Sequence, residues 1–351
     1  MKKAGVSLIT LSLVLPGLFS CSLSKENTTL IPLGQKYDSS LGLKEHFISL
    51  EYGLFENFLD NEKTFVLLIQ GDEDDCICYY DFCTALTTYM KKEDARIYHI
   101  KLKDLTENHG IKAQTNANAI AVFKKGKLVK QYLFKDSDKT IKDQDAFNEK
   151  MDSLVSWNDN VVYVNKSQLD ALYSSDLSGF TVLFARESCS DCSYMFSAFF
   201  EDYASSLKGD LYIYDVSEQR NLSSEEYQTF KDEYGLSFLY SDYGYSTGMV
   251  PTFQYIIPGS YTHKADLIKD AAVYANDSLS LVNNEYQVTS SYWSGTLYHE
   301  FLDGVNLDSK LQGKTIPNEQ VTNGYWGNEY ANDYHEPLIK EFLKFYVGVN
   351  E

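Results

Sequence analysis

The sequence predicts an α/β protein of two similar domains, each with a mixed central sheet covered by helices on both faces. The chain has 351 residues, which is enough for two domains of about 100–200 residues each. Hydrophobic residues make up 44% and charged residues 23%, as is typical of a globular protein rather than a disordered one. Strand and helix patterns alternate along the chain, and the same order of elements occurs twice, which favours two sheets of this kind.

The N-terminus is predicted to be a lipoprotein signal peptide. Met1-Lys2-Lys3 is a basic start, and the uncharged apolar stretch 4–20 is better suited to the core of a signal peptide than to a membrane span. It ends in Leu18-Phe19-Ser20-Cys21, which resembles the bacterial lipoprotein box, and this resemblance implies that Cys21 is lipidated. We therefore expect a leader over 1–21 and a protein held outside the cytoplasm on the cell membrane by lipid. An ordinary cleavable signal with an incidental cysteine is the alternative.

A spacer and a first domain are expected next. Residues 22–44 are rich in Ser, Thr and Asn with little periodicity, which predicts a flexible tether. The first domain is expected over 45–156. Its strands are predicted at 48–50, 65–70, 97–100, 119–123 and 127–132, with a hairpin turn at 124–126, and its helices at 54–59, 82–90 and 145–154.

The second domain is expected over 160–351, with the same order of elements. Its strands are predicted at 161–164, 180–186, 211–214, 253–257 and about 287–292. Its helices are predicted at 166–173, after Cys192, at 225–234 and at 337–347. Residues at about 294–332 fit none of these elements, and we interpret them as an insertion before the last helix.

The two halves share the phase of one helix. The residues that coincide when Cys78 is placed over Cys192 are Phe82 with Phe196, Leu86 with Phe200, and Tyr89 with Tyr203. Because these apolar positions recur at helical spacing in both halves, we infer that the halves are related.

The second half also carries two motifs at fixed places in this order. Cys189-Ser190-Asp191-Cys192 opens a helix after a buried strand, and Val250-Pro251-Thr252 leads into the closing hairpin. Together with the order of elements, these motifs resemble the thioredoxin superfamily over roughly 160–351. Residues 45–155 resemble the same fold with degraded motifs. The resemblance implies tandem thioredoxin-like domains, the second of them carrying the insertion.

The Cys189 and Cys192 pair is the candidate catalytic centre. Unpaired N–H groups and the positive end of the helix dipole stabilise a thiolate at the start of a helix, so Cys189 is expected to attack and Cys192 to resolve the mixed disulfide. The Asp191 carboxylate is expected to raise the thiol pKa values, which favours a reductant or an isomerase over an oxidant. A structural disulfide and half of a zinc site have the same spacing. The six histidines offer no paired zinc-ligand motif, and no cofactor or metal is predicted.

Pro251 is the second part of this candidate site. A proline that enters a strand removes a ladder hydrogen bond and therefore needs a reason, the start of an edge strand being the simplest. The resemblance places the family's cis-proline here, facing the cysteines. It implies substrate binding by Val250, Pro251 and Thr252, with the Val250 backbone pairing with an incoming peptide.

The cysteines of the first half make a weaker case. Cys76, Cys78 and Cys83 follow the acidic run 72–75, whose carboxylates would slow thiol attack, and the position of the attacking cysteine falls on Asp75. A secondary disulfide from Cys83 to Cys76 or Cys78 is plausible, whereas a bridge between Cys76 and Cys78 would be strained. This half is therefore read as a disulfide-stapled docking domain, with a redox-active or metal-binding domain as alternatives.

Charge narrows the class of partner. The chain has 31 Lys and Arg against 50 Asp and Glu and a net charge of −19, which argues against a nucleic-acid partner. We expect a thiol–disulfide oxidoreductase that acts on cysteines of exported proteins and depends on an unidentified redox partner. The alternative is a non-catalytic binding lipoprotein whose Cys189–Cys192 bridge is structural, because a fold can be kept while its chemistry is lost.

Overall fold

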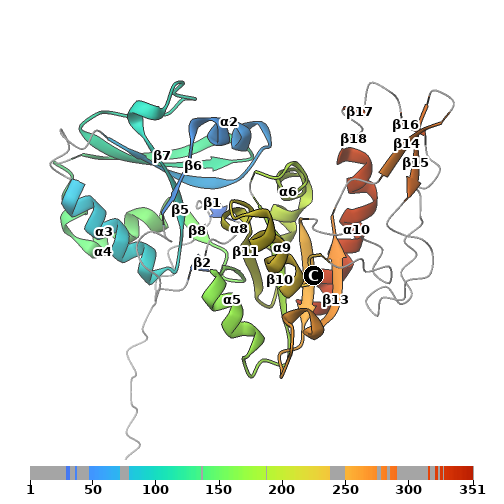
Figure 1. Ribbon diagram of the computed structural model, residues 1–351. Coiled ribbons are helices and arrows are strands. Elements are labelled where there is room, and N and C mark those ends of the chain that lie inside the picture. Colours follow the sequence, from blue (N-terminus) through green and yellow to red (C-terminus); the bar gives the residue numbers. More distant parts are fainter. Residues whose placement is uncertain are drawn as a thin grey trace, which may run out of the picture.

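The computed structural model describes the chain in segments. These are residues 29–31, 36–37, 47–71, 79–135, 137–186, 188–237, 250–274, 278–282, 285–290, 315–316, 321–322, 325–326 and 328–350. Figure 1 shows two α/β units, with the earlier one in blue to green and the later one in green to red.

The first domain has the elements that the sequence predicts. Its strands are β3 (Phe47–Ser49), β4 (Phe65–Gln70), β5 (Ile97–Lys101), β6 (Ala117–Lys124) and β7 (Lys127–Lys135). Its helices are α2 (Tyr52–Asp60), α3 (Tyr79–Lys92) and α4 (Gln144–Asp152), with 3₁₀ turns at Leu102–Asp104 and Lys139–Lys142. The sheet order is β3-β5-β4-β6-β7, in which β3, β5 and β4 are parallel and β6 and β7 are antiparallel.

Helices cover both faces of this sheet because successive strand residues point to opposite sides. Val66 and Leu68 of β4 pack in one buried cluster with α3 and α4. Phe65 and Leu67 pack in the other cluster with α2. The predicted mixed sheet between two helical layers is thus confirmed.

The second domain repeats this arrangement. Its strands are β9 (Val161–Tyr163), β10 (Phe180–Ala185), β11 (Leu211–Asp215), β12 (Thr252–Ile256) and β13 (Ile268–Val273). Its helices are α5 (Lys166–Tyr173), α6 (Ser190–Met195), α7 (Glu201–Ala204), α8 (Ser217–Arg220), α9 (Ser224–Glu233) and α10 (Asn328–Tyr346), with a 3₁₀ turn at Lys264–Leu267. The order β9-β11-β10-β12-β13 matches that of the first domain. The two units are thioredoxin-like domains in tandem.

One predicted strand was assigned to the wrong sheet. The strand that completes the second sheet is β13, and the predicted strand at 287–292 overlaps β15 (Glu285–Ser290), which lies in another sheet. β15 pairs with β14 (Ser278–Val282) and β16 (Thr315–Ile316). Residues 287–290 were correctly predicted to be extended, but the sequence of one segment does not say which neighbour the strand pairs with.

The predicted insertion at about 294–332 is only partly described. β16, β17 (Val321–Thr322) and β18 (Tyr325–Trp326) fall within it, and α10 begins at Asn328, before its predicted end. Residues 291–314 lie outside the described residues.

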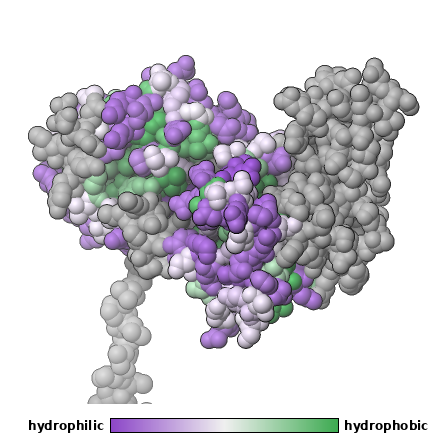
Figure 2. Space-filling view, viewed as in Figure 1, coloured by the Kyte–Doolittle hydropathy of each residue, from purple (hydrophilic) through white to green (hydrophobic). Residues whose placement is uncertain are grey.

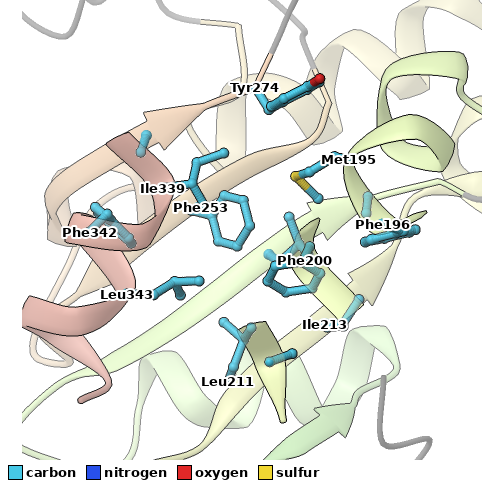
Figure 3. Close-up of a cluster of buried hydrophobic side chains, with 14 of the residues drawn as sticks. Met195, Phe196, Phe200, Leu211, Ile213, Phe253, Tyr274, Ile339, Phe342 and Leu343 are labelled. Carbon is cyan, nitrogen blue, oxygen red and sulfur yellow. The ribbon is translucent and has the colours of Figure 1, made fainter. Parts of the chain in front are cut away.

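The core of the second domain lies under α10. In Figure 3, side chains of α10 and of the helix that follows Cys189 point toward Phe253 of β12. Its ring centroid is 5.6 Å from that of Phe200 and 6.3 Å from that of Phe342. This packing fixes the helix that follows Cys189 against the sheet.

The predicted tether over 22–44 is structured in two places. β1 (Thr29–Ile31) pairs in parallel with β8 (Val155–Trp157) at the end of the first domain. β2 (Lys36–Tyr37) pairs in parallel with β9 and becomes the edge strand of the second sheet. A low-periodicity segment can still add edge strands, since backbone groups alone make those bonds.

The two domains contact each other directly. The side-chain oxygen of Asn57 in α2 lies 3.5 Å from the hydroxyl oxygen of Ser193 in α6. The side chain of Asn158, in the segment that connects the domains, donates to the Ala204 carbonyl at 3.0 Å.

Figure 2 shows hydrophobic residues gathered over the visible sheet of the first domain, with hydrophilic residues over α8 and α9. Val129 on β7 is 48% exposed.

Candidate functional site

The site is built at the end of β10. The strand stops at Ala185, and Cys189 is the N-cap of α6 with extended backbone angles. Its carbonyl accepts the N–H of Ser193 at 2.9 Å, which closes the first turn. The helix then continues through a π-turn at Phe196–Phe200 into α7. Cys189 therefore lies beside the N–H groups of the first helical turn, which have no carbonyl partner within the helix.

The structure brings Cys189 next to the residues predicted to bind substrate. Its half-buried thiol donates a hydrogen bond to the Val250 carbonyl, with 3.4 Å between Sγ and O. The bond between Val250 and Pro251 is cis. Thr252 begins β12, where it pairs with Phe184 of β10. Cys189, Val250, Pro251 and Thr252 thus lie at one edge of the sheet.

Cys192 lies behind Cys189 and away from solvent. It is fully buried, and its Sγ accepts the backbone N–H of Arg186 at 3.4 Å. Both cysteines are thiols in this structure. One sulfur is therefore reachable and the other is shielded.

The two thiols have opposite pKa shifts. A hydrogen bond from the Cys192 thiol lowers the pKa of Cys189 to about 6, helped by the backbone N–H groups of Cys192 and Asp191 and the charge of Arg186, while burial opposes it. Burial, chiefly, raises the pKa of Cys192 well above its usual range. The pair thus holds a nucleophile that ionises near neutral pH and a partner that keeps its proton.

The expected effect of Asp191 is corrected by this geometry. Its carboxylate was expected to raise the pKa of both thiols, but at Cys189 Asp191 acts through its backbone N–H and lowers the pKa. Its charge raises the pKa of Cys192 only as a minor cause. The helix start outweighs the carboxylate because N–H groups point directly at the thiolate.

Arg186 and Tyr274 belong to the site, although sequence reasoning missed both. Arg186 borders a very small cavity together with Phe196 and Asp215. The backbone N–H of Tyr274 donates to the Pro251 carbonyl at 3.1 Å. A rare arginine three residues before the first cysteine was an available signal for Arg186. None existed for Tyr274, because β13 was not predicted.

Only one of the three cysteines of the predicted secondary disulfide lies within the described residues. Cys76 and Cys78 lie outside the described residues, and Cys83 is half-buried in α3. Asn118 holds the position in the first domain that Pro251 holds in the second. The β6 residue after Asn118 pairs with the last-but-one residue of β4, just as Thr252 after Pro251 pairs with the last-but-one residue of β10. The Asn118 side chain accepts the Gly71 N–H at 3.1 Å. The first domain therefore has an amide in place of the proline.

The remaining predictions concern the membrane and metals. Cys21 lies outside the described residues. Within the part of the chain that is described, no helix is long and apolar enough to cross a membrane. The same residues contain no cluster of three or more His, Cys, Asp or Glu that could hold a metal ion.

No protein-family model and no curated protein matches the chain. Among solved structures, it is similar to the zinc-bound form of human ERp44, at 11% identity over 62% of this chain and 53% of that chain, with a TM-score of 0.22. It is also similar to the first two thioredoxin domains of Naumovozyma dairenensis Eps1p, at 11% identity over 63% and 89% of the chains, with a TM-score of 0.21.

A third similarity is to AhpF, a component of the alkylhydroperoxide reductase of Enterococcus faecalis, in a mutant form. It has 12% identity over 60% of this chain and 91% of that chain, with a TM-score of 0.18. The chain spans about half the length of the human ERp44 chain that it matches. The assignment of the fold rests on the strand orders of the two sheets, described above.

Proposed function

We propose that the chain is a membrane-anchored, extracytoplasmic thiol–disulfide oxidoreductase that acts on cysteines of exported proteins. The single observation that carries the proposal is the position of Cys189, half-buried at a helix start, with its thiol on the Val250 carbonyl beside Pro251. A staple that only stabilises the fold needs neither a reachable sulfur nor a depressed thiol pKa.

The reaction follows from the two pKa shifts. In the reductive direction, the Cys189 thiolate attacks one sulfur of a substrate disulfide, a mixed disulfide forms, and the other substrate sulfur leaves as a thiolate that takes a proton. Cys192 then loses its proton and attacks the Cys189 sulfur, which releases the second substrate sulfur. Two electrons pass to the substrate, and the protein keeps a Cys189–Cys192 disulfide. A separate redox partner must reduce it again.

The substrate strand would lie along Val250. In this proposal the backbone of Val250 pairs with the incoming chain, while Pro251 and Thr252 shape the surface beside the sulfur.

The pKa of Cys189 supports the reductive direction of the reaction. CxxC proteins range from about 3.5 in strong oxidants to about 7 in reductants, and a value of about 6 is closer to the reducing end.

A redox titration tests the chemistry. The full chain is equilibrated in glutathione buffers of known potential, alkylated, and analysed by mass spectrometry so that the state of each cysteine is known. We expect Cys189 and Cys192 to change together and reversibly. A pair that stays oxidised below about −300 mV would instead support a binding module with a structural disulfide.

The anchor is tested separately. In a bacterial host, the chain is expected to incorporate labelled fatty acid and to fractionate with membranes, whereas Cys21→Ala is expected to do neither. Equal labelling of both proteins would contradict lipidation at Cys21 and leave the redox chemistry unaffected.

A further inference from the structure

A buried carboxylate lies where the two domains meet. Glu201 of α7 is 4% exposed, and each of its two carboxylate oxygens lies 3.1 Å from the backbone nitrogen of Thr64, whose N–H donates to them. Thr64 precedes β4 of the first domain. Glutamate is almost never fully buried without compensation, so this contact between domains requires an explanation.

Glu201 is too far from the sulfurs to exchange protons with them directly. It follows Cys192 by nine residues on one continuous helical stretch, which corresponds to roughly 14 Å of rise. Its nearest surroundings are instead those of the first domain. The thiol chemistry therefore does not account for it.

The charged groups around Glu201 compensate only in part for the cost of burying its carboxylate. The charge of Lys63 lowers its pKa, but the Lys63 ammonium also donates to the Tyr98 hydroxyl at 2.9 Å and lies 3.8 Å from the centre of the Phe58 ring. Asp202, next along the helix, opposes ionisation.

A second cation nearby, Lys125, is engaged elsewhere. It lies on the hairpin turn of the first domain and pairs with Asp202 at 2.8 Å, and both side chains are largely exposed. Asp202 is the largest cause of the raised pKa of Lys125, and the charges of Glu201 and Glu62 come after it. Water screens an exposed pair of this kind, so it contributes little, and the buried carboxyl dominates the electrostatics of this contact.

We propose that the Glu201 carboxyl is a proton-operated latch between the two domains, closed when the carboxyl is neutral and loosened when it ionises. A neutral carboxyl loses little by burial, and its carbonyl oxygen still accepts the Thr64 N–H. An ionised carboxylate regains its hydration only when α7 parts from the segment that contains Thr64. The latch is independent of the proposed redox activity.

The direction of the pH dependence follows from the shift. Burial raises the pKa of Glu201 from 4.5 to about 7, against the opposing N–H bond from Thr64. The closed state therefore holds a proton that the parted state has released, so closure is favoured in acid and weakens as the pH rises from 4.5 through 7. Each pKa unit is a factor of ten in the closing equilibrium, so the shift from 4.5 to about 7 corresponds to a total change of roughly 300-fold.

Hydrogen exchange of the full chain, held in detergent micelles, tests the latch. The quantity is the protection factor of the Thr64 amide at pH 5.5 and 8.5, corrected for intrinsic exchange, with the β10 amides as the internal reference. We expect the protection of Thr64 to fall at least tenfold at the higher pH while that of β10 stays constant. In Glu201→Gln, which keeps an accepting carbonyl oxygen, protection is expected to be equal at both pH values.

A matched variant locates the effect. Asp202→Asn removes the neighbouring exposed carboxylate and is expected to keep the pH dependence. Equal protection of Thr64 at both pH values in the wild-type chain would overturn the proposal, as would a loss of the dependence in Asp202→Asn. The wild-type result decides the matter even if Glu201→Gln fails to fold.

Discussion

The backbone N–H of Arg186 donates to the buried Cys192 sulfur at 3.4 Å, just where β10 gives way to the helix that carries both cysteines. Arg186 thus contacts the Cys192 sulfur through its backbone and influences the Cys189 sulfur through its charge. The Arg186 charge lowers the pKa of Cys189 and so adds to the difference between the two thiols, whereas its N–H lowers the pKa of Cys192 and works against that difference.

The first prediction concerns the thiol pKa of Cys189. In the wild-type chain, the rate of iodoacetamide alkylation at Cys189 is expected to rise with pH about a midpoint near 6. Cys192→Ala removes the largest stabilising hydrogen bond, so the midpoint should move toward the ordinary value of about 8.5. Cys192→Ser keeps a donor and should fall between the two. A wild-type midpoint above 8 would contradict the geometry.

The second prediction concerns the charge of Arg186. Arg186→Met removes a cation that favours the Cys189 thiolate and should slow alkylation at pH 6 about two- to threefold, as expected when an interaction of about 0.5–1 kcal/mol is lost from a thiol that is half ionised at that pH. Arg186→Lys keeps the charge and should recover most of the rate. Arg220→Met, at an exposed position on α8, is the matched control and should have no effect. A loss common to all three variants would point to general damage.

The third prediction concerns the packing of the helix that carries the cysteines. Phe200 is fully buried against Phe253, so Phe200→Ala should lower the free energy of unfolding of the second domain by about 3–5 kcal/mol. Phe345→Ala, where the ring is 51% exposed, should change it by less than about 0.5 kcal/mol. Urea denaturation measures both, and similar values would argue against the packing in Figure 3.

The fourth prediction concerns His335 of α10. Burial lowers its pKa to about 4 from an ordinary 6.5. The unfolded chain binds a proton below pH 6.5 that the folded chain refuses, so stability falls as the pH drops from 6.5 toward 4. Between pH 7 and 5, the wild-type chain should lose about 1–2 kcal/mol more stability than His335→Gln. Parallel losses in the two proteins would assign the effect to other groups.

The sequence predicted the regular elements well because their apolar periodicity reflects burial. β4, with the sequence FVLLIQ, is buried along almost its whole length, as a continuous apolar run predicts. β13 was missed because Ile268–Val273 (IKDAAV) has a charged pair and two alanines between its β-branched ends, and residues of those kinds are depleted in strands.

The site could be predicted to a similar extent. Cys189, Cys192 and Pro251 could be singled out because each lies in a motif of fixed spacing, and their site remains a prediction. Glu201 could not be found, because its role depends on Thr64, which lies far away in the sequence. A single polar residue in an apolar helix pattern carries no information about which surface will cover it.

The short strands β1 and β2 give the chain a mechanical property. β1 pairs with the first domain and β2 with the second, and both lie between Cys21 and the folded units. A lipid at Cys21 would be about eight residues from β1, so β1 would lie within roughly 29 Å of the bilayer. A pull on that anchor would load the β1–β8 pairing in shear first and the β2–β9 pairing only after β1 had detached. The force would then reach the second domain, which carries Cys189 and Cys192, only after the pairing of β1 with β8 had broken.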